Sequence, residues 1–202
     1  MISYPPLKLG FLASKNGSSM RAMLEAIKAG ELAAEPRLLV SNNKKSGALE
    51  FAAACGMPTL VIPTQGDPEA ADARLCEAMK AAGVDLIIAS GYLRRLGPKT
   101  LGRYRNRVLN IHPGTLPAFG GEGMYGRRVH EAVIAAGVAE SGVTIHAVDE
   151  IYDHGPVIAR RSVPLQSGET AESLEARVTA LEPTFFVETL RQIAEGDLAL
   201  PS

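Results

Sequence analysis

Short apolar runs alternate with longer amphipathic stretches along the first half of the chain, and this alternation restricts the folds that it can adopt. The apolar runs are expected to form strands at 7–13, 37–42, 59–63 and 85–90, with helices at 18–32, 45–56 and 68–83 between them. Strands that are apolar throughout, rather than at every second residue, are typical of a parallel sheet covered on both faces. Because crossovers between parallel strands are right-handed, the pattern predicts a doubly wound, Rossmann-like α/β fold.

The order of elements changes after residue 104. The expected elements are a core strand at 107–112, a loop at 113–126, a helix at 127–137, a strand pair at 141–148 and 156–165, and a long helix from 170 to about 195. No repeat, low-complexity tract or linker interrupts the chain. Its 202 residues have room for one substantial core, so we expect a single domain over 1–202 with a mostly parallel sheet.

Charge and composition exclude several classes of protein. The chain has 21 Lys and Arg residues against 22 Asp and Glu residues, a balance that argues against a general nucleic-acid binder. It has no signal-peptide pattern at its start and no run near the roughly 18 apolar residues of a membrane span. Its two cysteines, Cys55 and Cys76, lack disulfide or metal spacing and are expected to be buried thiols. We therefore expect a soluble, cytoplasmic protein, a monomer or homodimer, without nucleic-acid or membrane partners.

The loop after the first strand, at 14–19, has the residues of an anion site. Gly17 allows a tight turn, and the hydroxyls of Ser18 and Ser19 accompany free N–H groups at the start of the next helix, an arrangement suited to a phosphate. A simpler alternative is that Ser18 only caps that helix. A GxGxxG match at 121–126 follows a proline-containing loop rather than a strand, so it does not predict a dinucleotide site. We expect this stretch to be a flexible, substrate-facing loop or a simple turn.

A second group of polar residues lies at the end of the strand at 107–112. Alternate residues of a strand share a face, so Asn110 and His112 project together; Asn110 can stabilise an oxyanion and His112 can move a proton. Asp153, in the turn after the next strand, is expected to orient His112 and to raise its pKa. Thr144 and His146 share one side of that next strand and are candidates for the same pocket.

Each of these residues also has a purely structural explanation. The histidines can be ordinary packed residues, and Asp153 an ordinary turn residue. A metal site of His112, His146, Asp153 and His154 has no supporting ligand spacing, so we expect no metal. No Gly-x-Ser-x-Gly motif occurs, which argues against a covalent serine mechanism.

Six segments, in order along nearly the whole chain, carry a family resemblance. They are NGSS (16–19), GYLRRL (91–96), NIHPGTLP (110–117), SGVTIH (141–146), DHGPVI (153–158) and EARVTALE (175–182). With them the chain resembles the 10-formyltetrahydrofolate-dependent formyltransferases, and among these the phosphoribosylglycinamide formyltransferases of de novo purine biosynthesis. The Asn-x-His pair followed by Asp-x-Gly points to the shared chemistry. The phosphate loop and the helix with Glu182 point to the ribonucleotide substrate.

The resemblance implies a single-domain formyltransferase fold that passes the formyl group of 10-formyltetrahydrofolate, a co-substrate, to the amine of 5′-phosphoribosylglycinamide without a metal. The implied catalytic residues are Asn110, His112 and Asp153, supported by Thr144 and His146. The implied ribonucleotide contacts are Asn16, Gly17, Ser18 and Ser19 on the phosphate and Glu182 on the amine. The implied folate contacts are Leu93, Arg94, Leu96, Asp149, Glu150, Ile151 and Tyr152.

Two departures from the family pattern and two other functions stay open at this point. The turn at 149–155 is one residue longer than in familiar members, so Asp149 competes with Asp153, although the following Gly155-Pro156 favours Asp153. The glycine-rich segment at 118–126 is longer as well. A formyltetrahydrofolate hydrolase would use the same trio with water as acceptor, but such enzymes resemble this domain with an added N-terminal regulatory domain. A non-catalytic ribonucleotide-binding module is the alternative from a different class.

Overall fold

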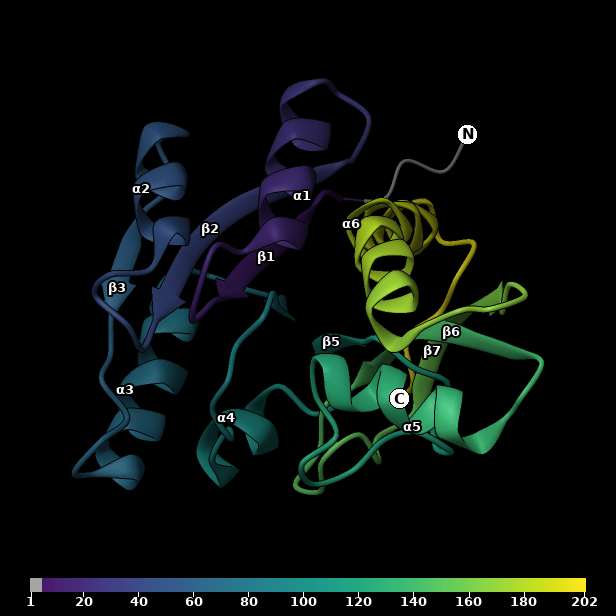
Figure 1. Ribbon diagram of the computed structural model, residues 1–202. Helices are drawn as coiled ribbons and strands as arrows, with labels where there is room; N and C mark the ends of the chain where they lie inside the picture. Colours follow the sequence, from purple (N-terminus) through teal and green to yellow (C-terminus); the bar gives the residue numbers. More distant parts are fainter. Residues whose placement is uncertain (1–4) are drawn as a thin grey trace.

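Seven strands form one sheet in the computed structural model, which describes residues 5–202 (Figure 1). The strands are β1 (Leu7–Leu12), β2 (Ala34–Ser41), β3 (Thr59–Val61), β4 (Leu86–Ala89), β5 (Val108–His112), β6 (Glu140–Ala147) and β7 (Val157–Pro164). Their order in the sheet is β3-β2-β1-β4-β5-β6-β7. The first five strands pair in parallel, whereas β6 runs antiparallel to β5 and β7. The predicted mostly parallel, doubly wound sheet is confirmed.

Helices cover both faces of this sheet. They are α1 (Ser18–Lys28), α2 (Gly47–Ala54), α3 (Pro68–Ala81), α4 (Pro98–Arg103), α5 (Arg127–Ala136) and α6 (Ala171–Glu195). Met23 of α1 and Phe186 of α6 are fully buried in one apolar cluster with Phe11 of β1. Met79 of α3 is fully buried in a second cluster with the next residue of β1, Leu12. Neighbouring residues of one strand thus enter opposite apolar layers, which explains why the strands are apolar throughout.

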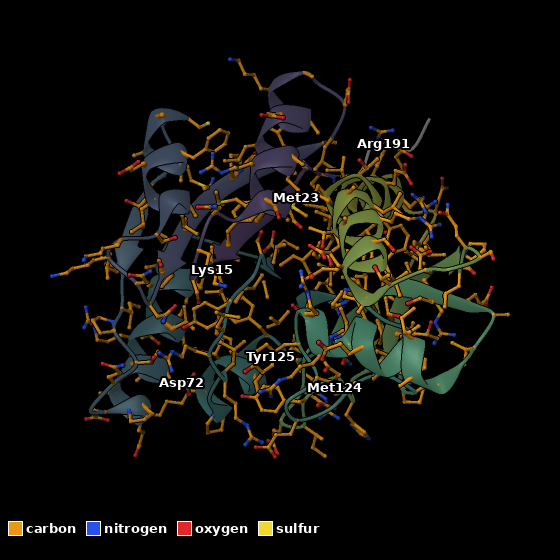
Figure 2. All side chains as sticks on the ribbon, viewed as in Figure 1. Lys15, Met23, Asp72, Met124, Tyr125 and Arg191 are labelled. Atoms are coloured by element: carbon orange, nitrogen blue, oxygen red, sulfur yellow. The ribbon has the colours of Figure 1, made fainter. Side chains whose placement is uncertain are left out.

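Helix α4 was not expected from the sequence. It has only six residues, too few to show an apolar period, and it begins with Pro98 in its first turn. A distant carboxylate supplies the missing cap: Asp72 of α3 accepts hydrogen bonds from the backbone N–H groups of Lys99 at 2.8 Å and Thr100 at 3.2 Å. Asp72 lies where α3 faces α4 (Figure 2). A tertiary contact therefore stabilises this helix, and no local signal announces it.

One of the two cysteines differs from the expectation. Cys76 is buried and Cys55 is exposed, and both are free thiols. Cys55 follows the last residue of α2, a short helix that buries only Ala48 and Ala52. The expected burial of Cys55 is therefore wrong, because the end of this helix turns toward solvent.

None of the helices within residues 5–202 is both long enough and apolar enough to cross a membrane. The longest of them, α6, lies against α1 and α5 (Figure 1). Arg191, near its end, donates through Nε to the carbonyl of Glu31 at 2.8 Å and so ties α6 to the loop after α1.

The carboxyl ends of β1, β4 and β5 meet at one edge of the sheet, and the loops that leave them are joined there. The backbone N–H of Ser14 donates to the carbonyl of Gly91 at 3.2 Å, and the Ser14 hydroxyl accepts from the N–H of Leu93 at 2.9 Å. Helix α1 is held at the same edge, because the N–H of Met20 donates to the hydroxyl of Ser90 at 3.1 Å. Ligands of open α/β sheets bind at such an edge.

Candidate active site

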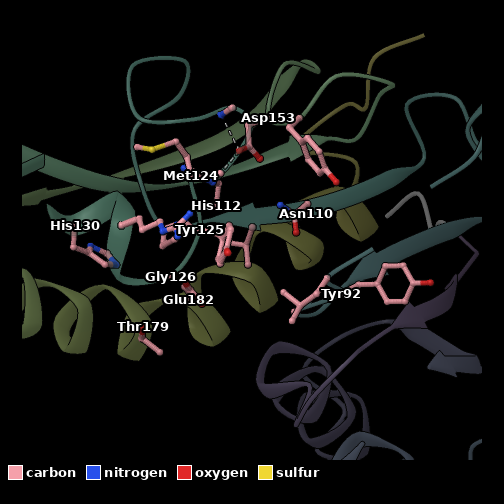
Figure 3. A pocket seen from close by; sticks show the side chains of 18 of the residues that line it. Tyr92, Asn110, His112, Met124, Tyr125, Gly126, His130, Asp153, Thr179 and Glu182 are labelled. Carbon is pink, nitrogen blue, oxygen red and sulfur yellow. Dashed lines mark hydrogen bonds and ion pairs between the residues drawn. The ribbon is translucent and has the colours of Figure 1, made fainter. Parts of the chain in front are cut away.

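Polar side chains of β5 and β6 meet at the carboxyl end of β5. The antiparallel register places Asn110 opposite His146 and His112 opposite Thr144. The Asn110 amide nitrogen Nδ2 lies 3.2 Å from Nε2 of His146. His112 and His146 are both almost completely buried. The strand positions predicted from alternation therefore bring these four side chains to one place, as Figure 3 shows for Asn110 and His112.

The Asp153 carboxylate lies between the two histidines. Its Oδ2 is 3.5 Å from Nδ1 of His112, and its Oδ1 is 3.5 Å from Nε2 of His146. The N–H of Gly121 also donates to Asp153 Oδ2, at 3.1 Å. Asp153 itself has a left-handed backbone with φ of 56°, at the turn that directs its side chain inward. The glycine-rich loop therefore contacts a carboxylate that belongs to the turn after β6.

The other carboxylate of that turn points elsewhere. Asp149 accepts from Nδ1 of His154 at 2.8 Å and from the N–H of Ile151 at 2.9 Å. This contact between the two side chains is exposed. Of the two aspartates that the sequence leaves in competition, Asp153 is the one that faces His112.

Backbone carbonyls determine which ring nitrogens carry protons, since a carbonyl oxygen only accepts hydrogen bonds. The carbonyl of Ala147 lies 3.0 Å from Nδ1 of His146, so this nitrogen donates and Nε2 accepts from the Asn110 amide. The carbonyl of Phe119 lies 2.7 Å from Nε2 of His112, so Nε2 donates there and Nδ1 faces Asp153. One hydrogen of the Asn110 amide is thereby donated to His146, and the second has no partner within residues 5–202.

The environment sets the charges of His112 and Asp153. Burial lowers the pKa of the His112 imidazole below its ordinary 6.5, although the Asp153 carboxylate and the Phe119 carbonyl act in the opposite direction. Asp153 does act to raise the pKa of His112, as expected. The expected net increase is nevertheless wrong, because the effect of burial is larger. Burial also acts to raise the pKa of Asp153, yet the two histidines and the Gly121 N–H hold it below 3.8. Near neutral pH the pair is a neutral imidazole beside a carboxylate.

A cavity of about 770 Å³ opens over this cluster. Asn110, His112 and Asp153 line one side of it, and residues of α6 line another, among them Thr179 and Glu182 (Figure 3). Burial raises the pKa of the Glu182 carboxyl to about 7. No side-chain hydrogen bond or ion pair joins Glu182 to another residue within 5–202. Glu182 is therefore a carboxyl group in the cavity wall whose hydrogen-bonding capacity is unused.

The start of α1 forms a further part of the cavity wall. Gly17, with φ of 63°, is the N-cap residue of α1, and Ser18 is the first residue inside the helix. The alternative that Ser18 only caps the helix is therefore wrong. Ser18 and Ser19 line the cavity, whereas Asn16 and Gly17 are not among its lining residues. Arg21 ties this loop to the start of α2 by donating to the carbonyls of Asn16 at 2.8 Å and Gly47 at 2.9 Å.

Only part of the expected folate-binding set reaches the cavity. Leu93, Arg94 and Tyr152 line it. Leu96 instead packs against the apolar cluster under α3. The exposed residues Glu150 and Ile151, and with them Asp149, are not among the lining residues. The backbone of Glu150 is nevertheless tied to the loop after β4, because its carbonyl accepts from Arg95, whose guanidinium also lies 5.6 Å from the Tyr152 ring.

Thr144 and His146 act from behind the cavity wall. The Thr144 hydroxyl is fully buried, donates to the carbonyl of Gly114 at 2.7 Å and accepts from the N–H of Leu116 at 3.3 Å. It therefore holds the loop after β5. His146 contacts Asn110 and Asp153 and does not line the cavity.

Several lining residues were not expected from the sequence. They are Tyr92, Arg128, His130, Glu175 and Thr179, whereas Met124 and Tyr125 belong to the glycine-rich stretch that was expected to face the substrate or to form a simple turn. His130 is 1% exposed, and its Nδ1 has no hydrogen-bond partner within the described residues. Glu175, Thr179 and Glu182 are four and three residues apart, a spacing that places them on one helix face. That spacing was visible in the sequence, but which face of α6 meets the cavity depends on tertiary packing.

Within residues 5–202, no three His, Cys, Asp or Glu side chains are grouped so that they could hold a metal ion. In the cluster at the carboxyl end of β5, each histidine donates the N–H of one ring nitrogen to a backbone carbonyl and turns its other ring nitrogen toward Asp153.

Comparisons with known proteins agree with this architecture. The curated protein "Phosphoribosylglycinamide formyltransferase" from Bacillus subtilis is 32% identical to this chain, and the match covers 92% of this chain and 94% of that protein. The chloroplastic protein of the same name from Vigna unguiculata is 38% identical over 93% of this chain and 61% of that protein, so this chain spans about three fifths of its length. A solved structure, a glycinamide ribonucleotide transformylase from Symbiobacterium toebii, superposes with a TM-score of 0.86 at 32% identity, covering 98% of this chain and 92% of that chain.

A model of one protein family also matches most of the chain. It is described as formyl transferase, and the match extends over residues 7–190, from the first residue of β1 to Leu190 near the end of α6. The match includes β5, the turn with Asp153 and the α6 face with Glu182. This chain belongs to the formyl transferase family.

Proposed function

We propose that this protein transfers the formyl group of 10-formyltetrahydrofolate to the amine of 5′-phosphoribosylglycinamide. The family implies a folate-type co-substrate, and the relatives described above are named for this acceptor. The observation that carries the proposal is one cavity in which the Asn110, His112 and Asp153 side chains face both the start of α1 and the unpaired Glu182. Such a cavity suits an anionic group, an amine and a reacting carbonyl at the same time.

In this proposal the phosphate of the ribonucleotide binds at the start of α1. Free backbone N–H groups, the positive end of the helix dipole and the hydroxyls of Ser18 and Ser19 favour a phosphate there. Asn16 and Gly17 then contribute through the shape of the loop, which Arg21 stabilises by donating to the Asn16 carbonyl. The Glu182 carboxylate accepts a hydrogen bond from the amine.

In this proposal the folate binds beside the loop after β4. Leu93 is 56% exposed and Tyr152 is 49% exposed, and both line the cavity near Arg94. Apolar side chains left open at a cavity mouth suit a flat aromatic ring such as a pterin. Leu96, Asp149, Glu150 and Ile151 support these two segments without lining the cavity.

The reaction needs stabilisation of one developing negative charge. The amine nitrogen attacks the formyl carbon, a C–N bond forms, and the carbonyl oxygen becomes an oxyanion. The free hydrogen of the Asn110 amide is available to donate to that oxygen, because the other hydrogen is held by His146. His146 and Thr144 therefore act as positioning residues for Asn110 and for the loop after β5.

The reaction also moves one proton. The attacking amine loses a proton, N10 of the folate gains one, and the bond between N10 and the formyl carbon breaks. A neutral imidazole beside a carboxylate is suited to accept and return that proton: His112 takes it at Nδ1, where Asp153 Oδ2 lies 3.5 Å away and stabilises the resulting imidazolium. His112 is therefore neutral before the reaction and charged during it.

A steady-state assay of folate deformylation, with and without the ribonucleotide, tests the proposal. We expect turnover only when phosphoribosylglycinamide is present. Turnover that does not depend on the ribonucleotide would instead indicate the hydrolase, which uses the same residues with water as acceptor. Binding of the ribonucleotide without any turnover would indicate the non-catalytic module.

A further inference from the structure

Pro183 lies inside α6, a helix of 25 residues, directly after Glu182. Proline is the least favourable residue in a helix interior, because it lacks a backbone N–H and its ring crowds the carbonyl of the residue four positions earlier. The helix nevertheless continues for twelve residues beyond it, to Glu195. A proline in this position leaves one backbone acceptor of the helix unused.

That acceptor is the carbonyl of Thr179. In an α-helix the carbonyl of each residue accepts from the N–H four residues later, and position 183 has none to offer. Helical carbonyls point toward the following turn, so this oxygen lies beside the turn that carries Glu182. Thr179 and Glu182 both line the cavity and occupy successive turns of α6 (Figure 3).

The Thr179 carbonyl and the Glu182 carboxylate both require a hydrogen-bond donor. Glu182 makes no side-chain hydrogen bond or ion pair within residues 5–202, and the Thr179 carbonyl has lost its helical donor. A carbonyl and a carboxylate placed one turn apart accept hydrogen bonds from a group with at least two N–H hydrogens, whereas a hydroxyl has only one hydrogen to donate.

We propose that the Thr179 carbonyl, freed by Pro183, is a second acceptor for the amine of the formyl-accepting substrate, beside Glu182. Pro183 is then a positioning residue that favours an amine over a hydroxyl at this point of the cavity. This inference rests on the proposed function, since it identifies the group that α6 recognises in the acceptor.

The substitution Pro183→Ala tests it, because alanine restores the missing N–H and closes the helical hydrogen bond to Thr179. Calorimetry should measure the Kd of two ligands: phosphoribosylglycinamide and the analogue in which a hydroxyl replaces its amine. We expect Pro183→Ala to raise the Kd of the amine ligand by about threefold to tenfold, the effect of one hydrogen bond, and that of the hydroxyl ligand by less than about twofold. Because the helix gains a hydrogen bond, Tm should rise.

Thr184→Ala is the matched control, since Thr184 is exposed and its backbone N–H is unchanged. We expect this variant to bind both ligands like the parent protein. If Pro183→Ala binds the amine ligand as tightly as the parent, or weakens both ligands equally, the inference is wrong while the proposed function stands. If the parent protein binds the amine ligand no more tightly than the hydroxyl ligand, the inference is also wrong. Failure of the parent to bind either ligand refutes the proposed function together with it.

Discussion

Replacing Asp153 by asparagine isolates the charge that stabilises the His112 imidazolium. The carboxylate oxygen lies 3.5 Å from Nδ1, and at an effective dielectric constant of about 20 two unit charges at that distance attract by about 5 kcal/mol. Since 1.36 kcal/mol corresponds to a factor of ten in rate, the loss of this attraction lowers kcat by at most about 3.5 orders of magnitude. The Asn side-chain dipole replaces part of the stabilisation, so we expect a loss of about 10²-fold to 10³-fold, in the range of general acid-base catalysis.

The assay is steady-state formyl transfer by the parent protein, Asp153→Asn and Asp149→Asn, with kcat and the two KM values determined separately. Asp149 is the matched control, because it lies in the same turn and pairs with His154 instead of facing the cavity. KM for the ribonucleotide should change little in either variant, since neither aspartate is a proposed contact of the phosphate or of the amine. A kcat within twofold of the parent for Asp153→Asn, or an equal loss for Asp149→Asn, would refute the reasoning.

Three further predictions follow from the contacts described. Glu182→Gln should raise KM for the ribonucleotide. In the parent protein we expect this KM to fall between pH 6 and 8, as the Glu182 carboxyl with its pKa of about 7 ionises, and the variant should lose this dependence. An unchanged pH profile in the variant would contradict the assignment. Thr144→Val leaves the buried Leu116 N–H without its acceptor, so denaturant unfolding should show a loss of about 1 to 3 kcal/mol, and a loss below about 0.5 kcal/mol would show that this contact is unimportant. Because burial lowers the folded-state pKa of His112, the unfolded chain binds more protons below pH 6.5, so stability should fall as the pH decreases from 7 toward 5, and His112→Asn should reduce this dependence.

The sequence predicts those parts of the fold that depend on local pattern. Strands apolar throughout require cover on both faces, and Phe11 and Leu12 enter the two clusters accordingly. Alternation along β5 places Asn110 and His112 on one face, and the antiparallel partner strand brings Thr144 and His146 beside them. In each case the period of the pattern is that of the element itself.

The parts that were missed depend on tertiary contacts. Helix α4 exists because Asp72 of another helix caps it. Leu96 packs under α3 instead of facing the cavity, although Leu93 three residues earlier does face it. The net pKa shift of His112 was mispredicted, because burial depends on everything packed around the ring whereas its interaction with Asp153 depends on one neighbour. His130 enters the cavity wall from α5 with no motif to mark it.

The fate of the formyl carbon tests the central claim most directly. The protein is incubated with phosphoribosylglycinamide and 10-formyltetrahydrofolate carrying ¹³C in its formyl group, and the products are followed by NMR. We predict that the label appears in an N-formyl amide of the ribonucleotide, with none of it in formate. Label in formate, or label that stays on the folate while the ribonucleotide is present, would contradict the account.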